Sequence, residues 1–136
     1  LYNKDIENIS NFLSKLNNFK FVDYEFDLNS ILNVCDVLIS DYSGVIFDYL
    51  YLDRPIIIYA PDYAKFNDEN GFVFDPLKNK IGHVAKNLTD LNNLIYDYSS
   101  NKIEFKEEYN LNRKLVKNKV FTNDKGIKNL INLLEN

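Results

Sequence analysis

The sequence has 136 residues, 46% of them hydrophobic, and this length and composition fit one folded domain and exclude an intrinsically disordered chain. Its single cysteine, Cys35, excludes an intramolecular disulfide and a multi-cysteine metal cluster, which favours a reducing compartment such as the cytoplasm. The net charge is −4, and residues 21–76 hold eleven acidic side chains against two basic ones, so we expect no nucleic-acid partner.

Apolar residues recur at helical and strand spacing through the first half of the chain. Asp27 is a candidate cap for a short helix, and β-branched residues dominate the run at 56–59. The predicted elements are helix 5–16, strand 19–22, helix 28–34, a buried strand 37–39, helix 43–52, which Arg54-Pro55 would stop, and strand 56–59.

Turn-forming residues then punctuate 60–82, which we predict to be mostly loop around a small strand at 72–74. Three helices are predicted to close the chain, at 88–98, 104–120 and 124–134. This alternation predicts an α/β fold with a Rossmann-like parallel sheet and flanking helices. Ligands of such sheets bind outside the carboxyl ends of the strands, where the loop 40–44 lies.

The loop 40–44 carries the chain from a strand into a helix within a few residues. A helix N-terminus presents free N–H groups and roughly half a unit of positive charge, so it attracts phosphate. Gly44 has no side chain to keep a phosphate away, and Ser40 and Ser43 add hydroxyl donors. The pattern therefore predicts a phosphate-binding loop.

Asp48, one turn into the predicted helix, is placed to accept a hydrogen bond from a ribose hydroxyl. The alternative is that Asp41 or Ser43 only caps the helix, as such residues commonly do. The local pattern leaves both interpretations open.

Other polar residues favour structural roles. We expect His83 to be a loop residue rather than a general base, Cys35 to be a small core residue, and Arg54 to satisfy carbonyl groups at a helix end. The basic helix at 104–120 could lie on an anionic membrane, but its interspersed glutamates favour a solvated helix with internal ion pairs. The side chains that could approach a ligand from the predicted loop after 56–59 are Asp62, Lys65 and Asn67.

Three stretches together resemble the C-terminal signature of the CDP-glycerol glycerophosphotransferase family. The longest is Asp-Val-Leu-Ile-Ser-Asp-Tyr-Ser-Gly-Val-Ile-Phe-Asp-Tyr at 36–49, and Asp-Arg-Pro-Ile-Ile at 53–57 and Gly-Phe-Val-Phe-Asp at 71–75 follow in the same order and spacing. The Asn-Asp-Lys-Gly at 123–126 is similar to the start of that family's last helix. The resemblance covers most of residues 20–135.

The resemblance implies the C-terminal, nucleotide-binding half of a GT-B fold, here as one domain spanning 1–136 and excised from a larger transferase. Such enzymes move glycerol phosphate or a related polyol phosphate from a CDP-activated donor, CDP-glycerol, to a teichoic-acid or capsule-like polymer, without a metal centre or cofactor. Gly44 stands where the family usually has a second serine. The positions that would surround the CDP moiety are Ser40, Asp41, Ser43, Gly44, Val45 and Asp48.

In these transferases the catalytic histidines lie upstream of the region present here, so no catalytic residue is assigned and the fragment alone is expected to be inactive. Its polymer acceptor would bind through a missing N-terminal domain. The implied location is the cytoplasm, and the inner face of the cell membrane, with peripheral association of the full-length protein, is the alternative.

Two other classes of protein stay open. The run at 41–48 is also similar to the nucleotide-binding pattern of UDP-GlcNAc 2-epimerases and other GT-B enzymes that use UDP-sugars. A non-catalytic α/β module is the rival from outside the enzymes.

Overall fold

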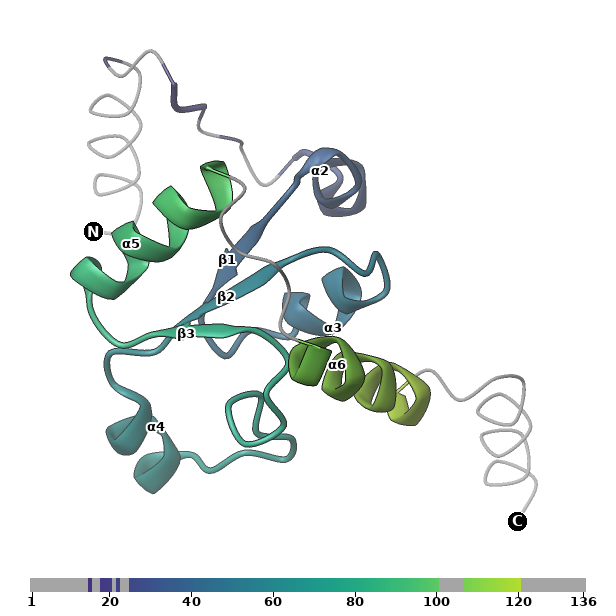
Figure 1. Cartoon of the computed structure of the whole chain (residues 1–136), viewed down its shortest axis with the longest axis vertical. Helices are drawn as coiled ribbons and strands as arrows, with labels where there is room; N and C mark the ends of the chain where they lie inside the picture. Colours follow the sequence, from purple (N-terminus) through teal and green to yellow (C-terminus); the bar gives the residue numbers. More distant parts are fainter. Residues whose placement is uncertain (1–14, 16–17, 21, 23–24, 101–106, 121–136) are drawn as a thin grey trace. The chain divides into compact units, whose positions relative to one another are not determined.

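The structure is a computed structural model that describes residues 15, 18–20, 22, 25–100 and 107–120 (Figure 1). The chain forms two compact units, Leu1–Val34 and Cys35–Asn136, which are described separately. The first unit contains helix α2, Leu28–Val34. Asp27 caps it, because its Oδ2 accepts hydrogen bonds from the backbone N–H of Ser30 at 3.1 Å and from the Ser30 hydroxyl at 2.6 Å. The predicted cap is confirmed.

Two predicted helices, 5–16 and 124–134, lie outside the described residues. Of the strand predicted at 19–22, the described residues belong to no strand, so this prediction is wrong for them.

The second unit is built on three short parallel strands. They lie in the order β1-β2-β3, with Leu38 opposite Ile56 and Ile57 opposite His83. This arrangement confirms the predicted α/β class with a parallel sheet. The elements are β1 Leu38–Ser40, α3 Val45–Leu50, β2 Ile56–Tyr59, α4 Tyr63–Glu69, β3 His83–Ala85, α5 Leu88–Ser99 and α6 Glu107–Val120.

Helices cover both faces of this sheet (Figure 1). Helix α5 packs against β2 and β3, whereas α3 packs against β1 and β2 and is itself contacted by α6. The central strand β2 is consequently buried on both sides, and Ile56, Ile57 and Ile58 are at most 1% exposed. The predicted run of β-branched residues is thus the centre of the core.

The prediction for β1 was less accurate. Its strand covers Leu38–Ser40 instead of 37–39, and it is not buried, because Ile39 is 45% exposed. The physical reason is position, since β1 pairs with β2 alone among the described strands.

Helix α3 is shorter than the predicted 43–52. It begins after Gly44 and ends at Leu50, and the chain leaves it through hydrogen-bonded turns to Asp53, which adopts φ 55°. A residue in this left-handed region ends a helix as effectively as a proline, so the helix stops before Pro55 is reached.

The segment 60–82 departs most from the prediction of a loop around a strand. It contains helix α4, whose end is set by Gly71 in the left-handed conformation, φ 68°, with its N–H bonded to the Asn67 carbonyl at 3.0 Å. The residues 72–74 form no strand, and β3 follows instead at His83–Ala85. The expectation that His83 lies in a loop is therefore wrong.

Helix α5, Leu88–Ser99, agrees closely with the helix predicted at 88–98. Asn87 caps it by accepting from the Asp90 N–H at 2.9 Å, while Asp90 accepts from the Asn87 side chain at 3.0 Å. The described part of α6 agrees with the predicted helix 104–120. None of the described helices is long and apolar enough to cross a membrane.

Candidate functional site

The predicted phosphate loop lies at the carboxyl end of β1. Ser40 is the last residue of that strand and is half-buried, whereas Asp41, Ser43 and Gly44 are exposed. Asp41 Oδ1 accepts a hydrogen bond from the backbone N–H of Ser43 at 2.8 Å. This bond forms a turn before α3, whose N-cap is Gly44, and it is not the helix cap that the sequence left as an alternative.

Gly44 provides open access to the start of α3. Its backbone is right-handed, φ −58° and ψ −21°, and a Cβ built on it meets nothing within 4 Å. Within the described residues, the N–H groups of Gly44 and Val45 make no hydrogen bond. Because α3 has only six residues, its summed helix dipole is small, and the predicted phosphate site would depend on individual N–H groups.

The remaining predicted site residues fall close to this opening. Val45 is the first residue of α3 and is half-buried, and Asp48 lies in the first turn with its side chain exposed. The structure therefore keeps the six candidates on one continuous strand–turn–helix segment at one end of the sheet.

A contact that the sequence did not predict joins this loop to the next one. The Tyr42 hydroxyl donates a hydrogen bond to Asp62 Oδ1 at 3.1 Å, and Asp62 follows β2 directly before α4. Burial of the Tyr42 ring, and then the bond to the Asp62 carboxylate, raise the pKa of Tyr42 above its ordinary value. The loops at the ends of β1 and β2 are therefore held to one another.

Aromatic rings continue from Tyr42 into the segment after β2. The ring centroid of Tyr42 lies 4.5 Å from that of Phe66 and 5.2 Å from that of Phe72, and Tyr63 stacks on Phe72 at 5.7 Å with an interplanar angle of 16°. The sequence signal was the spacing of Tyr63 and Phe66, which places both on one face of a helical turn. The turn-forming residues on either side of them favoured a loop, so this helical spacing was not recognised.

Asp75 anchors the far end of this segment. It is 8% exposed and accepts from the Tyr63 hydroxyl at 2.6 Å and from the N–H groups of Leu77 at 2.9 Å and Lys78 at 3.1 Å. Burial opposes ionisation of this carboxyl, but the bonds from Tyr63 and Lys78 outweigh it and lower the pKa of Asp75. Asp75 therefore acts as a structural anion.

The expectations for Cys35 and Arg54 need correction. Cys35 is half-buried rather than part of the core, and its carbonyl accepts from the Tyr49 hydroxyl at 2.8 Å and from Arg54 Nη1 at 2.7 Å. Arg54 does satisfy a carbonyl, but one just before β1 instead of one at its own helix end. The side chain thus fixes the approach to the sheet and is not aimed at the phosphate loop.

His83 contacts α5. Its Nδ1 lies 2.6 Å from the hydroxyl oxygen of Tyr98, which is a hydrogen bond whichever group donates. The contact joins β3 to the helix that covers it.

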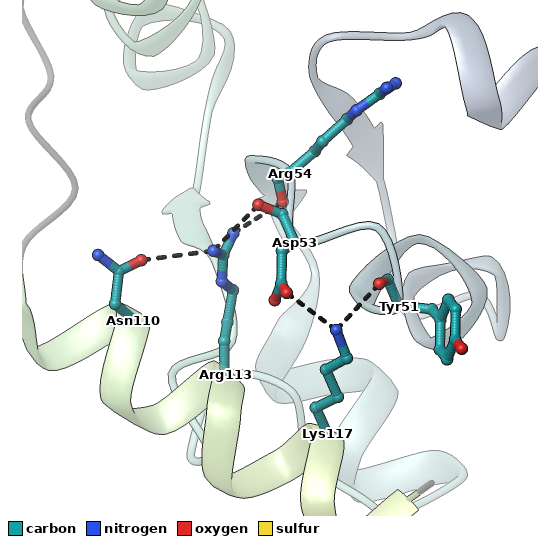
Figure 2. Close-up of polar contacts among 6 residues, drawn as sticks. All are labelled: Tyr51, Asp53, Arg54, Asn110, Arg113 and Lys117. Atoms are coloured by element: carbon teal, nitrogen blue, oxygen red, sulfur yellow. Dashed lines mark hydrogen bonds and ion pairs between the residues drawn. The ribbon is translucent and has the colours of Figure 1, made fainter.

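The basic residues of α6 have a packing role that the sequence did not predict (Figure 2). Arg113 donates to the carbonyls of Arg54 at 2.8 Å and Asp53 at 3.2 Å, and Lys117 lies 2.9 Å from the Asp53 carboxylate. Lys117 also donates to the carbonyl of Tyr51 at 3.0 Å. These two side chains dock α6 on the turn after α3, so they form packing contacts that neither interpretation of the basic helix predicted.

Within the described ranges, no group of three or more His, Cys, Asp or Glu residues could hold a metal ion.

The family described as CDP-glycerol:poly(glycerophosphate) glycerophosphotransferase matches residues 2–132. The chain belongs to this family. A teichoic acid glycerol-phosphate transferase of Staphylococcus aureus is 43% identical over 70 residues, which are 51% of this chain and 18% of that protein. A teichoic acid poly(glycerol phosphate) polymerase of Bacillus subtilis is 36% identical over 83 residues, which are 60% of this chain and 11% of that protein. A teichoic acid glycerol-phosphate primase of Bacillus subtilis is 27% identical over 137 residues, which are 98% of this chain and 32% of that protein.

Family membership confirms the resemblance inferred from the sequence motifs. The chain corresponds to between 11% and 32% of the length of these three relatives.

Proposed function

We propose that this chain is the donor-nucleotide-binding part of a longer transferase that moves glycerol phosphate, or a related polyol phosphate, from a CDP-activated donor to a cell-surface polymer. Its family membership supports the activity, and the relatives' names supply glycerol phosphate and teichoic acid as the substrates to test first. The polymer acceptor and the catalytic groups then come from outside these 136 residues. The reaction takes place in the cytoplasm or at the inner face of the cell membrane.

The observation that carries the nucleotide site is the opening at Gly44. Two backbone N–H groups, those of Gly44 and Val45, make no hydrogen bond in the described part of the chain, and a Cβ built on Gly44 meets nothing within 4 Å. Such groups bind a diphosphate without a lysine or a metal ion. Ser43 stands beside them with an exposed hydroxyl group.

Asp48 has a different part in this proposal. Its carboxylate would repel a phosphate, but it accepts hydrogen bonds from ribose hydroxyls. Asp41 stays a turn residue, because its carboxylate is already bonded to the Ser43 N–H.

Thermal-shift titration with CDP, CDP-glycerol, UDP and UDP-GlcNAc tests the proposal. A ligand that binds only the native state raises the melting temperature once its concentration exceeds Kd. We expect stabilisation by CDP and CDP-glycerol at lower concentrations than by the UDP compounds. A preference for the UDP compounds contradicts the cytidine donor, and no shift with any nucleotide favours a non-catalytic module.

A further inference from the structure

Helix α6 carries two exposed leucines on the side opposite to its packed side. The packed side contacts α3 and holds Arg113 and Val116, which are 7% and 4% exposed. Leu111 and Leu115 are four residues apart, so they lie one above the other along the helix, and they are 61% and 52% exposed. We call these two leucines the outer strip of α6. The strip is an apolar surface that the described residues leave largely uncovered.

The chain continues beyond α6, which ends at Val120, with residues 121–136 outside the described part. Their sequence predicts a helix at 124–134, with Asn123 and Asp124 as candidate caps. An isolated helix shorter than about 12–15 residues is only marginally stable in water, so a helix of this length needs a surface that covers its apolar side. The apolar residues at the spacing of one helical face are Ile127, Leu130, Ile131 and Leu134.

The short connection limits which surface this segment can reach. Residues 121–123 span at most about 10 Å, and helices joined by so few residues are antiparallel neighbours. At about 1.5 Å per residue, Leu115 and Leu111 lie roughly 8 and 14 Å before the end of α6. The apolar residues of a helix that starts at 124 lie about 5 to 15 Å from its own start. The two apolar strips therefore overlap in an antiparallel pair.

The small size of the outer strip favours an occupant that is already attached to α6. Two leucine side chains offer much less than the roughly 800 Å² per partner that a stable interface between separate proteins buries. An attached segment needs less area, because a short connection gives it an effective concentration in the millimolar range.

The charge on this side of α6 is less suited to an anionic membrane. Among the α6 side chains that the structure describes, Lys114 is the one cation on the side of the outer strip, since Lys117 is bonded to Asp53 and Arg113 is buried. Binding to anionic lipids typically relies on a cluster of several lysines or arginines.

We infer that residues 124–134 form a helix that packs antiparallel on α6 and covers Leu111 and Leu115 with its apolar side. Helix α6 then lies between α3 and this last helix, and its outer side is closed to other partners. The inference does not depend on nucleotide binding.

Cysteine pairs in the full chain test this contact. The change Cys35→Ser removes the natural thiol, so that the introduced thiols are the only ones. Leu115→Cys is combined with Ile127→Cys or with Ile131→Cys, and the control combines it with Asn129→Cys, on the opposite side of the predicted helix. Because a disulfide needs Cα atoms about 4.4–6.8 Å apart, we expect at least one of the two pairs to oxidise about tenfold faster than the control.

A second measurement needs no cross-link. With Leu115→Cys as the only thiol, its rate of reaction with a soluble thiol reagent reports how far position 115 is covered. We expect Ile131→Asp to raise this rate severalfold, because a carboxylate on the apolar side opposes docking, and Asn129→Asp to leave it unchanged.

Three results would overturn the inference. Equal oxidation rates in the test and control pairs, with no effect of Ile131→Asp, would show that the segment does not dock. Disulfide-linked dimers of the variant with Leu115→Cys alone, formed in preference to the intramolecular bond in the pairs, would assign the strip to a second copy of the chain. Protection of the thiol only after addition of phosphatidylglycerol vesicles would assign it to a membrane.

Discussion

Arg113 donates a hydrogen bond to the backbone carbonyl of Arg54 over 2.8 Å, which joins helix α6 to the turn that leads into the central strand (Figure 2). The two residues are 59 positions apart in the sequence. Arg113 is 7% exposed, and burial lowers the pKa of its guanidinium group. A buried charge is retained here because its donors reach two backbone carbonyls in the turn after α3.

Arg113→Ala should therefore destabilise the fold. The change removes the hydrogen bonds to the Arg54 and Asp53 carbonyls, and we expect a loss of about 2–3 kcal/mol in the free energy of unfolding, measured by urea denaturation. The control is Lys114→Ala on the same helix, where the side chain is exposed and the loss should stay below about 0.5 kcal/mol. Equal losses in the two variants would show that the hydrogen bonds of Arg113 do not stabilise the fold.

Gly82 should tolerate no side chain. A Cβ at this position lies 2.5 Å from the backbone oxygen of Ile56, so β3 or β2 must move to accommodate it. We expect Gly82→Ala to cost about 1–3 kcal/mol, the usual range for overpacking. Gly44→Ala is the matched control, since the space around Gly44 is open, and its midpoint of chemical denaturation should equal that of the parent within error.

Gly44→Val should weaken nucleotide binding without unfolding the domain. The branched side chain extends from Gly44 into open space beside the start of α3, so it displaces no protein atom near its Cβ, and in the proposed site it would obstruct the phosphate. Ser43→Ala should cost less, at most the 1.5–3 kcal/mol or so of one charged hydrogen bond, and Lys65→Ala should cost least, because that side chain pairs with Glu69 on α4. Calorimetry with CDP measures all three.

The backbone mechanism would be refuted if Gly44→Val bound CDP like the parent and Lys65→Ala bound it more weakly.

Asp48→Asn adds a second check on the same site. It should weaken CDP but not pyrophosphate, which has no hydroxyl groups to donate.

Asp75 should make stability depend on pH in the acidic range. Its pKa in the folded protein is lowered below the ordinary value of 3.8, so the unfolded state binds a proton more readily and the ionised carboxylate stabilises the fold. This contribution is fully present above pH values near 3.8 and is lost as the pH falls through the lower folded value. Asp75→Asn should therefore lose stability at pH 7, by about 1–3 kcal/mol.

The free energies of unfolding of Asp75→Asn and the parent should differ less as the pH falls. Denaturation series at pH 7 and pH 3 would measure this difference. Tyr63→Phe removes the 2.6 Å hydrogen bond to the same carboxylate and should raise the pKa of Asp75 toward its ordinary value. A difference that stays constant across the two pH values would show that Asp75 acts through packing alone.

The sequence by itself determined the elements whose signals are local. The isoleucines at 56–58 have no polar face to expose, so they had to lie in the centre of the sheet, and Asn87 with Asp90 carries the cap of α5 in four consecutive residues. The motif at 36–49 likewise specified its own strand–turn–helix and the family, because its order of residues is long enough to be distinctive.

Tertiary structure decided the elements whose residues are satisfied only by distant partners. Strand β3 exists because His83–Ala85 pairs with β2 and Gly82 lets the two backbones meet, and neither condition is visible in a three-residue run that begins with histidine. Helix α4 is stabilised by the packing of the Tyr63 and Phe66 rings on Tyr42, which lies about twenty residues earlier in the chain. The local sequence of this segment favoured a loop.

The basic residues of α6 show the same limit. An arginine on a helix is equally compatible with solvent, a membrane or a carbonyl, since its charge is satisfied by any of them. Only the fold placed the turn after α3 and the side chain of Arg113 within hydrogen-bonding distance. Backbone carbonyls are present at every residue, and the sequence does not show which of them a distant side chain can reach.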